Sequence, residues 1–462
     1  MRVIFVIRHT GEGQIGIMSL SGVLKQRGHR VEIVEAGYKK IKERLRAGHS
    51  AILAYSTPTR YADYYIQLNR RIKREFDVFS VFGGPHPTAV PEITEEEGVD
   101  GVCRGEGELA MAELADNLSN GKSVRDIKNW WIKEDGKIYR NPPRPLIENL
   151  DELPFPDREL FRKLPLFDEE KIHIITGRGC PYDCSYCFNP VYNRLYEGKA
   201  GKIRRRSVCN VIEEIRQAQK RFPLKFLVFD DDLFVLPYEW IKEFSRHYKK
   251  EVGLPFFCYL RADLVNPEII RHLKGAGCFS ISMGIETADD NLRNFVLKRN
   301  MSKEQIIGAA REIKNNRIRL KASNIIGIPG GSLEADIETA GLNARCSVDY
   351  SSVEILTPYP GTEIYKLIID SGAVDKDNYW SKDYKGLRNR PELVNFQMIF
   401  ALTVEFPVLF TLVRILLRLP AIRLYNLFYL LWEGYCAYFR LYPSGLRGFL
   451  RGIKKYIKLI KK

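Results

Sequence analysis

The sequence predicts an α/β fold in three parts, and three observations lead to this expectation. Over the first 120 residues, short apolar runs alternate with stretches of helical spacing, which predicts a doubly wound, flavodoxin-like parallel sheet. From about residue 171 to residue 366 the alternation resumes in six strand–helix units, which favours a partial or full barrel. After about residue 391 the chain becomes rich in Leu, Phe, Tyr and Arg, and we expect an α-helical C-terminal region.

The first part is expected to contain five strands with helices between them. The expected strands cover residues 2–7, 30–35, 50–55, 78–82 and 100–103, and the expected helices cover 15–27, 38–47, 61–76 and a stretch ending near residue 120. In a doubly wound sheet the ligand lies beyond the carboxyl ends of the strands. The residues at those ends are Ser56, Thr57, Gly83, Gly84, His86, Gly105, Glu106 and Gly107.

The central part is expected to contain six further strands. They cover residues 172–176, 226–229, 256–260, 280–284, 322–328 and 352–356. Six prolines and a hairpin signal at Asp135-Gly136 mark the stretch before them as a connector. The predicted boundaries are therefore 1–130 for the first domain, 131–165 for the linker, 166–390 for the barrel and 391–462 for the helical region.

The bulk composition indicates an ordinary globular protein. The chain has 462 residues, of which 45% are hydrophobic and 28% charged, so disorder throughout is excluded. Nine scattered cysteines indicate reduced thiols rather than a disulfide framework. The apolar run that follows Met1 and Arg2 is too short for a signal peptide, so a cytoplasmic location is expected.

The positive charge is concentrated near the C-terminus. From Ile399 onward, eleven Lys and Arg residues against two acids give +9 of the total net charge of +15. Residues 445–462 place apolar side chains on one helical face and Lys and Arg on the others, which predicts a basic amphipathic helix. Such a helix could contact an anionic membrane from one side or shape a lipid pocket; the alternative is a helical cap over the barrel.

Three cysteines lie within eight residues, directly after a predicted barrel strand: Cys180, Cys184 and Cys187. Three thiolates can bind three irons of a 4Fe–4S cluster and leave the fourth iron open to chelate amino and carboxylate groups. Structural zinc normally takes four protein ligands, and no second cysteine pair is present. The motif therefore favours an iron–sulfur cluster over zinc.

The spacing of these cysteines, with Tyr186 before the last, resembles the radical S-adenosylmethionine (SAM) superfamily over residues 166–390. The resemblance implies a partial (β/α)6 barrel, a 4Fe–4S cluster held by the three cysteines, and reductive cleavage of SAM to a 5′-deoxyadenosyl radical. It also implies a reductant such as flavodoxin or ferredoxin as a partner.

The same resemblance assigns SAM-binding residues to the strand ends: Tyr186, Asp231, Asp232, Arg261, Glu286 and Gly327. Asp231 and Asp232 would meet the amino group of SAM, or else cap the next helix. Arg261 would pair with its carboxylate, or else form a surface ion pair. Glu286 would bind the ribose, or else be a solvated acid. Gly331 departs from the family pattern, which often has an acid there, so no side chain is assigned at that position.

Motifs before the cysteines resemble the cobalamin-binding class of radical SAM enzymes over residues 1 to about 390. They are the stretches 83–88, 104–108 and 150–156. The resemblance implies cobalamin bound by Ser56, Thr57, Gly83, Gly84, His86, Gly105, Glu106 and Gly107, with plain turn geometry as the alternative for the glycines. Residues 8–13 lack the D-x-H-x-x-G loop, so no histidine ligand to cobalt is expected from there, and His86 is more simply a structural residue.

The resemblance implies a cobalamin-dependent radical SAM enzyme that methylates an unactivated carbon. One SAM would supply the radical, methylcobalamin the methyl group, and a second SAM would re-methylate cobalt. The alternatives are a non-methylating enzyme that cyclises, couples or rearranges a lipid or tetrapyrrole, and a non-catalytic cobalamin or metal sensor. The expected substrate is a small or lipid-like molecule, and no nucleic-acid partner is expected, because no reading motif is present.

Overall fold

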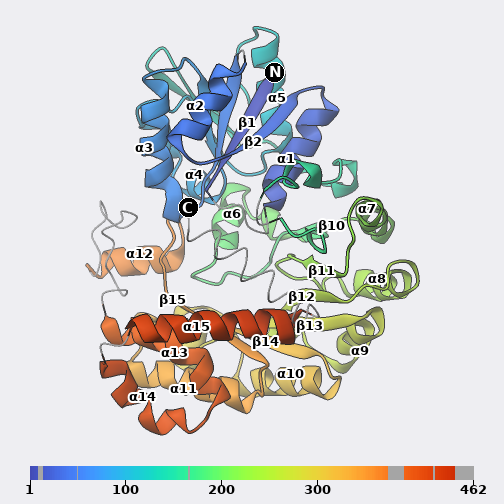
Figure 1. Ribbon diagram of the computed structural model, residues 1–462, viewed down its shortest axis with the longest axis vertical. Helices are drawn as coiled ribbons and strands as arrows, with labels where there is room; N and C mark the ends of the chain where they lie inside the picture. The colour runs from blue at the N-terminus through green and yellow to red at the C-terminus, as the bar shows by residue number, and fades with distance from the viewer. Residues whose placement is uncertain (9–13, 49, 165–166, 373–389, 420–421, 443–462) are drawn as a thin grey trace. The chain divides into compact units, whose positions relative to one another are not determined.

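The computed structural model describes residues 1–8, 14–48, 50–164, 167–372, 390–419 and 422–442 (Figure 1). The chain folds into two compact units, each of which consists of three separate segments of the chain. The first unit consists of Met1–Asp168, Tyr186–Arg204 and Tyr359–Tyr384, and the second of Glu169–Ser185, Arg205–Pro358 and Lys385–Lys462. The boundary between two of these segments falls inside the cysteine motif, between Ser185 and Tyr186.

The first unit contains a seven-stranded sheet in the order β2-β1-β3-β4-β5-β6-β7. The first five strands pair in parallel, and β6 and β7 add an antiparallel hairpin. The strands are β1 (Arg2–Ile7), β2 (Arg30–Glu35), β3 (Ala51–Ser56), β4 (Phe79–Gly83), β5 (Gly101–Cys103), β6 (Trp130–Glu134) and β7 (Lys137–Arg140). The order 2-1-3-4-5 is that of flavodoxin-like folds, so the predicted architecture is confirmed.

Helices cover both faces of this sheet (Figure 1). They are α1 (Ile15–Gln26), α2 (Tyr38–Arg46), α3 (Ala62–Lys73), the short α4 (Pro85–Ala89) and α5 (Glu108–Ser119). Successive residues of β1 point to opposite faces. Phe5 packs in a core with residues of α1 and α5, whereas Ile4 packs in a second core with residues of α2 and α3. Both faces are therefore buried, which explains why these strands are continuous apolar runs.

The hairpin at Asp135-Gly136 is present, but it extends the first sheet. Residues 101–103 of β5 pair with β6, so the sheet continues to Arg140, ten residues past the boundary at 130 drawn from the sequence. Asn129 joins this region to the preceding loop, because its side-chain amide donates to the Glu106 carbonyl at 2.7 Å.

The second unit contains a six-stranded, all-parallel sheet in the order β15-β14-β13-β12-β11-β8. The strands are β8 (Lys171–Ile174), β11 (Phe226–Phe229), β12 (Phe256–Leu260), β13 (Cys278–Glu286), β14 (Arg319–Ile326) and β15 (Tyr350–Ile355). The helices between them are α7 (Val208–Arg221), α8 (Tyr238–Glu251), α9 (Pro267–Ala276), α10 (Lys303–Asn315) and α11 (Leu333–Arg345). Strands that follow one another in the chain lie side by side, so this is the predicted half-barrel.

After β15, α12 (Glu363–Asp370) belongs to the first unit, and α13 (Pro391–Glu405), α14 (Leu409–Arg418) and α15 (Ile422–Tyr435) belong to the second. Phe396 and Phe400 of α13 pack in one core with Val353 and Ile355 of β15, so α13 covers the edge of the sheet. No helix in the described part of the chain is long and apolar enough to cross a membrane. The amphipathic helix predicted for 445–462 lies outside the described residues.

Candidate functional site

The cysteine motif forms a loop after β8 and the short strand β9 (Gly177–Arg178). Cys184 is buried, Cys180 and Cys187 are half-buried, and all three are free thiols. Burial raises the pKa of the Cys180 thiol to about 11, and the nearby Asp232 carboxylate acts in the same direction. Within the described ranges, no group of three or more His, Cys, Asp or Glu side chains is gathered around a single ion position. Three soft, unoxidised donors on one loop fit a cubane cluster, in which each thiolate binds a different iron.

Two hydrogen bonds from Ser185 to one peptide segment hold this loop in place. The backbone N–H of Ser185 donates to the Leu297 carbonyl at 3.2 Å, and the Ser185 hydroxyl donates to the Val296 carbonyl at 2.6 Å. Val296 ends a π-helical turn, Leu292–Val296. π-Helical turns are rare and frequently occur at functional sites.

Arg261, which follows β12, is a buried partner of the cysteine loop. Its guanidinium donates to Cys184 Sγ at 3.4 Å, to the Arg299 carbonyl at 2.8 Å and to both oxygens of Asp263. It also lies over the Tyr182 ring at 3.5 Å from the centroid. These partners differ from the expected SAM carboxylate, and with a side chain only 8% exposed, Arg261 does not form the surface ion pair considered as its alternative.

The two aspartates after β11 differ in their surroundings. The carboxylate of Asp231 is buried and accepts from the Thr176 N–H at 3.0 Å, from the Thr176 hydroxyl at 2.8 Å and from Arg205 at 2.6 Å. Asp232 is exposed. Neither caps the next helix, because the N-cap of α8 is Pro237. Asp231 thus ties the ends of two strands together, and Asp232 is the acid of this pair that can reach a ligand.

Glu286 ends β13 in a strained conformation. Its φ is 63°, a left-handed value that costs a non-glycine residue of order 1–3 kcal/mol and that clusters at functional sites. Its carboxylate is buried and pairs with Arg299 at 3.3 Å, so the alternative of a solvated acid is wrong. A Cβ at Gly284 would collide with the Glu286 carboxylate, so a larger residue there would push this side chain out of its observed position.

Gly327 begins the glycine-rich turn after β14. Its φ is 69°, and its N–H donates to the Asp336 carboxylate at 3.2 and 3.3 Å. Burial raises the pKa of Asp336 to about 7. Asp336 was not predicted from the sequence, although an acid in the first turn of the helix after this glycine-rich turn was an available signal.

The first group of cobalamin candidates lies at the carboxyl ends of β3 and β4. The Thr57 N–H donates to the Gly83 carbonyl at 2.8 Å, and the His86 N–H donates to the Thr57 carbonyl at 3.2 Å. Gly84 has a φ of 105°, and a Cβ there would lie 3.2 Å from Thr57 N. Burial lowers the pKa of His86 to about 4, so the imidazole is neutral at pH 7. Ser56 is half-buried beside them.

The second group, after β5, is engaged by the protein itself. The Glu106 carboxylate is buried and binds Arg204 through both oxygens, at 2.8 and 3.2 Å. Gly105 has a φ of 83°, and a Cβ there would collide with the Tyr196 hydroxyl. A Cβ at Gly107 would lie 3.2 Å from Leu20. These contacts account for the residue types without a ligand. Neither Tyr196 nor Arg204 carried a sequence signal.

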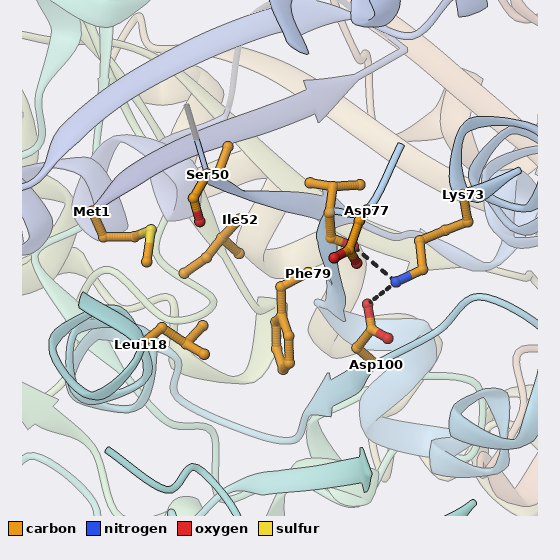
Figure 2. Close-up of a pocket in the computed structure, with 10 residues that line it drawn as sticks. Met1, Ser50, Ile52, Lys73, Asp77, Phe79, Asp100 and Leu118 are labelled. Carbon is orange, nitrogen blue, oxygen red and sulfur yellow. Dashed lines mark hydrogen bonds and ion pairs between the residues drawn. The ribbon is translucent and has the colours of Figure 1, made fainter. Parts of the chain in front are cut away.

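A cavity of about 240 Å³ lies at the opposite edge of the first sheet (Figure 2). Its lining includes Ile52 and Phe79, which stand near the amino ends of β3 and β4. The Lys73 ammonium points to the Asp100 carboxylate at 2.7 Å and to the Val78 carbonyl at 2.8 Å. Ligands of doubly wound sheets bind at the carboxyl ends, so this cavity is not the predicted site.

The fold and the thiol loop define a protein that combines a flavodoxin-like domain with a half-barrel carrying three cysteines. Comparison with known proteins agrees: the radical SAM superfamily matches residues 174–342, and the B12 binding domain matches residues 3–115. The chain therefore belongs to the cobalamin-binding radical SAM proteins, as the sequence motifs predicted.

Two relatives align with much of this chain. An uncharacterized methyltransferase of Pyrococcus horikoshii is 35% identical over 315 residues, which span 66% of this chain and 66% of the relative. An anaerobic magnesium-protoporphyrin IX monomethyl ester cyclase of Rubrivivax gelatinosus is 26% identical over 81% of this chain and 71% of the relative.

Among solved structures, the radical SAM methyltransferase TsrM of Kitasatospora setae, with cobalamin and a [4Fe-4S] cluster bound, has a TM-score of 0.67 at 17% identity. The similarity covers 80% of this chain and 75% of TsrM. The apo form of the cobalamin-dependent SAM radical enzyme OxsB has a TM-score of 0.68 at 17% identity, covering 95% of this chain and 72% of OxsB. These likenesses confirm the fold.

Proposed function

We propose that this protein is a cobalamin-dependent radical SAM enzyme that methylates an unactivated carbon of a small-molecule substrate. The observation that carries the proposal is the presence, in one chain, of a three-thiol loop at the end of a half-barrel strand and a B12-binding domain. The relatives named methyltransferases support the reaction class, including a cytidylyl-2-hydroxyethylphosphonate methyltransferase of Streptomyces wedmorensis at 22% identity.

When bound, the cluster with SAM supplies radical chemistry and cobalamin supplies methyl transfer, so the side chains mainly bind and orient. Cys180, Cys184 and Cys187 would hold the cluster. Asp232, exposed and near Cys180, would accept hydrogen bonds from the ammonium of SAM. Glu286 would accept from the ribose hydroxyls, and its strained backbone supports this role.

Other predicted ligands also pair with protein groups, as the Glu286 carboxylate does with Arg299. Asp231 and Glu106 form buried ion pairs with arginines, and Arg261 pairs with the half-buried Asp263. At the ends of β3 and β4, Thr57 and Gly84 would let the backbone approach a flat ligand. The neutral His86 would line that site without adding charge.

The test is anaerobic reconstitution with iron, sulfide and cobalamin, followed by reduction in the presence of SAM labelled in its methyl group with deuterium. We expect bound corrin in a stoichiometric amount, 5′-deoxyadenosine, and a product that carries the deuterated methyl. Protein that binds no corrin at any ratio would contradict the proposal. Protein that binds corrin but releases no 5′-deoxyadenosine would be a sensor instead.

A ring-forming or otherwise non-methylating reaction is the second candidate. It is favoured by the match to a cyclase over 81% of this chain, the larger share among the two relatives compared above. The same incubation separates the two reactions, because a non-methylating enzyme would form 5′-deoxyadenosine and a product without deuterated methyl.

The electron required for SAM cleavage must come from outside the chain. We propose a low-potential donor such as a flavodoxin or ferredoxin as the reductant. Replacing dithionite by reduced flavodoxin in the incubation above should sustain 5′-deoxyadenosine formation; no product with any protein donor, despite product with dithionite, would contradict this partner.

We further propose that the C-terminal region contacts an anionic membrane surface. Eleven of the fourteen large apolar side chains that are exposed in the described residues lie between 406 and 435: Phe406, Val408, Leu412, Ile415, Leu419, Leu424, Leu427, Phe428, Leu430, Leu431 and Tyr435. Arg414 and Arg418 are exposed on the same stretch, and the sequence from Ile399 onward carries eleven basic and two acidic residues. Apolar and cationic side chains together are typical of interfacial helices.

Flotation with liposomes tests this contact. The full chain should float with vesicles containing phosphatidylglycerol and much less with phosphatidylcholine alone. Truncation after Ser444, or the change Ile415→Glu together with Leu427→Glu, should reduce flotation. Equal flotation of all forms would refute the proposal.

A further inference from the structure

We propose that Arg261 is a positioning residue that tunes the reduction potential of the cluster bound by the cysteine loop. The inference rests on the proposed function, because it presupposes a cluster on Cys184. It assigns Arg261 to the protein side of the cluster, acting on a ligand sulfur, and not to the SAM carboxylate.

The Arg261 guanidinium lies between the cysteine loop and the backbone of Arg299. One terminal nitrogen of Arg261 donates to Cys184 Sγ at 3.4 Å, and the other donates to the Arg299 carbonyl at 2.8 Å. The guanidinium plane also faces the Tyr182 ring, two residues before Cys184 in the same loop. Arg261 therefore holds the loop through a sulfur and an aromatic ring at once, in a buried setting where both contacts are strengthened.

A hydrogen bond to a cysteine sulfur raises the potential of an iron–sulfur cluster. The reduced cluster carries more negative charge on its sulfurs than the oxidised one, so a donor stabilises the reduced form more. Asp263 modulates this effect, because its carboxylate binds the same guanidinium at 3.0 and 3.2 Å and offsets its positive charge. Loss of Arg261 would leave the half-buried Asp263 carboxylate without its cation, whereas loss of the Asp263 charge would leave the buried guanidinium uncompensated.

Arg299, which accepts a hydrogen bond from Arg261, also contacts Glu286, the residue proposed to bind the ribose. The Arg299 carbonyl accepts from Arg261, while the Arg299 guanidinium pairs with Glu286 at 3.3 Å and donates to the Gly284 carbonyl at 2.8 Å. Arg299 thus connects the end of β13 to Arg261, the arginine that contacts the cysteine loop. Arg299 therefore holds the end of β13 and the residue after β12 in fixed positions relative to each other, within the second unit.

The test compares full-length, reconstituted Arg261→Gln and Asp263→Asn with wild type by redox titration, following the reduced cluster by electron paramagnetic resonance. At the potential where wild type is half reduced, we expect the reduced-to-oxidised ratio to fall at least ten-fold in Arg261→Gln, equal to about 59 mV for one electron. We expect the ratio to rise in Asp263→Asn. Arg216→Gln, which removes a surface arginine paired with Glu251 at 3.0 Å, should stay within two-fold of wild type.

Opposite changes of the reduced-to-oxidised ratio in the two variants distinguish tuning of the potential from a merely structural role. A loosened loop would lower the iron content of both variants and would not change the ratio in opposite directions. If Arg261→Gln does not fold or does not bind iron, the reduced-to-oxidised ratio of Asp263→Asn alone tests the proposal. An unchanged ratio in Asp263→Asn, or in both variants, would overturn the proposal. Wild-type protein without a cluster would overturn the proposed function as well, and its iron and sulfide content would reveal this before any variant is compared.

Discussion

Arg204 binds the carboxylate of Glu106 through both terminal nitrogens, at 2.8 and 3.2 Å, although 98 residues separate them in the chain. Both side chains are buried, and Arg204 also donates to the Ile147 carbonyl at 2.7 Å. The pair fastens the segment after the cysteine motif to the end of β5, within the first unit. Glu106, which was predicted from its motif to bind cobalamin, therefore stabilises the first unit through a buried ion pair.

Breaking this pair should destabilise the first unit strongly. Arg204→Gln leaves a buried carboxylate without its cation, and we expect a loss of about 3–5 kcal/mol in the free energy of unfolding. Urea unfolding followed by tryptophan fluorescence measures it, because Trp130 and Trp131 lie in β6 of the same sheet. Arg27→Gln, which removes a half-exposed partner of Asp116, should cost less than about 1 kcal/mol. Equal losses in the two variants would contradict this assignment.

Gly105 should not tolerate a side chain. Gly105→Ala combines a φ of 83° with a collision against the Tyr196 hydroxyl, and we expect about 2 kcal/mol or more of destabilisation. Gly16→Ala, where a Cβ meets nothing within 4 Å, is the control and should be neutral or stabilising. Adding Tyr196→Phe to Gly105→Ala should cost less than the sum of the single changes. Strict additivity would mean that the two residues do not interact.

Gly284 should control SAM binding through Glu286. A Cβ at Gly284 would displace the Glu286 carboxylate, so Gly284→Ala should weaken SAM binding at least ten-fold, as measured by equilibrium dialysis of the reconstituted protein. Gly308→Ala, in α10 with open space around its Cβ, should leave the affinity unchanged. Unchanged affinity in Gly284→Ala would remove Glu286 from the predicted SAM site.

Cys184 should be required for the cluster, whereas Cys209 should not. Cys184→Ala removes one of the three proposed thiolate ligands, so reconstituted iron should fall sharply and 5′-deoxyadenosine should disappear. Cys209, exposed at the start of α7, is the matched control, and Cys209→Ala should retain both. Iron content and product are measured by colorimetric assay and mass spectrometry. SAM cleavage that survives in Cys184→Ala would show that the cluster assignment is wrong.

His86 should make the first unit sensitive to acid. Burial lowers its pKa from 6.5 to about 4, so the folded state binds the proton less readily than the unfolded state does. The stability it contributes is present above pH 6.5 and is lost as the pH falls toward 4, a change of up to about 3 kcal/mol. His86→Gln should lose less stability than wild type between pH 7 and pH 4, measured by thermal unfolding.

The sequence by itself determined both α/β units and the position of the thiol loop. Nearly every predicted strand matches the observed one to within about two residues, as in β1, β3, β11 and β12, because strands buried on both faces are contiguous apolar runs between helices. The cysteine motif could be located because its three residues are close together in the chain and follow a strand. The motifs before it were sufficient to identify the family for the same reason.

Only the tertiary structure decided what the charged residues at the strand ends contact. Asp231 and Glu106 were both predicted as cofactor ligands from their positions after strands, yet each carboxylate pairs with an arginine far away in the chain, Arg205 and Arg204 respectively. A charge after a strand can remain solvated, bind a ligand or form a buried pair. The outcome depends on the free energy of desolvation and on which opposite charge the fold brings within about 3 Å. Because Arg204 and Arg205 lie far from these acids in the chain, the spacing of residues in the sequence could not reveal the pairs.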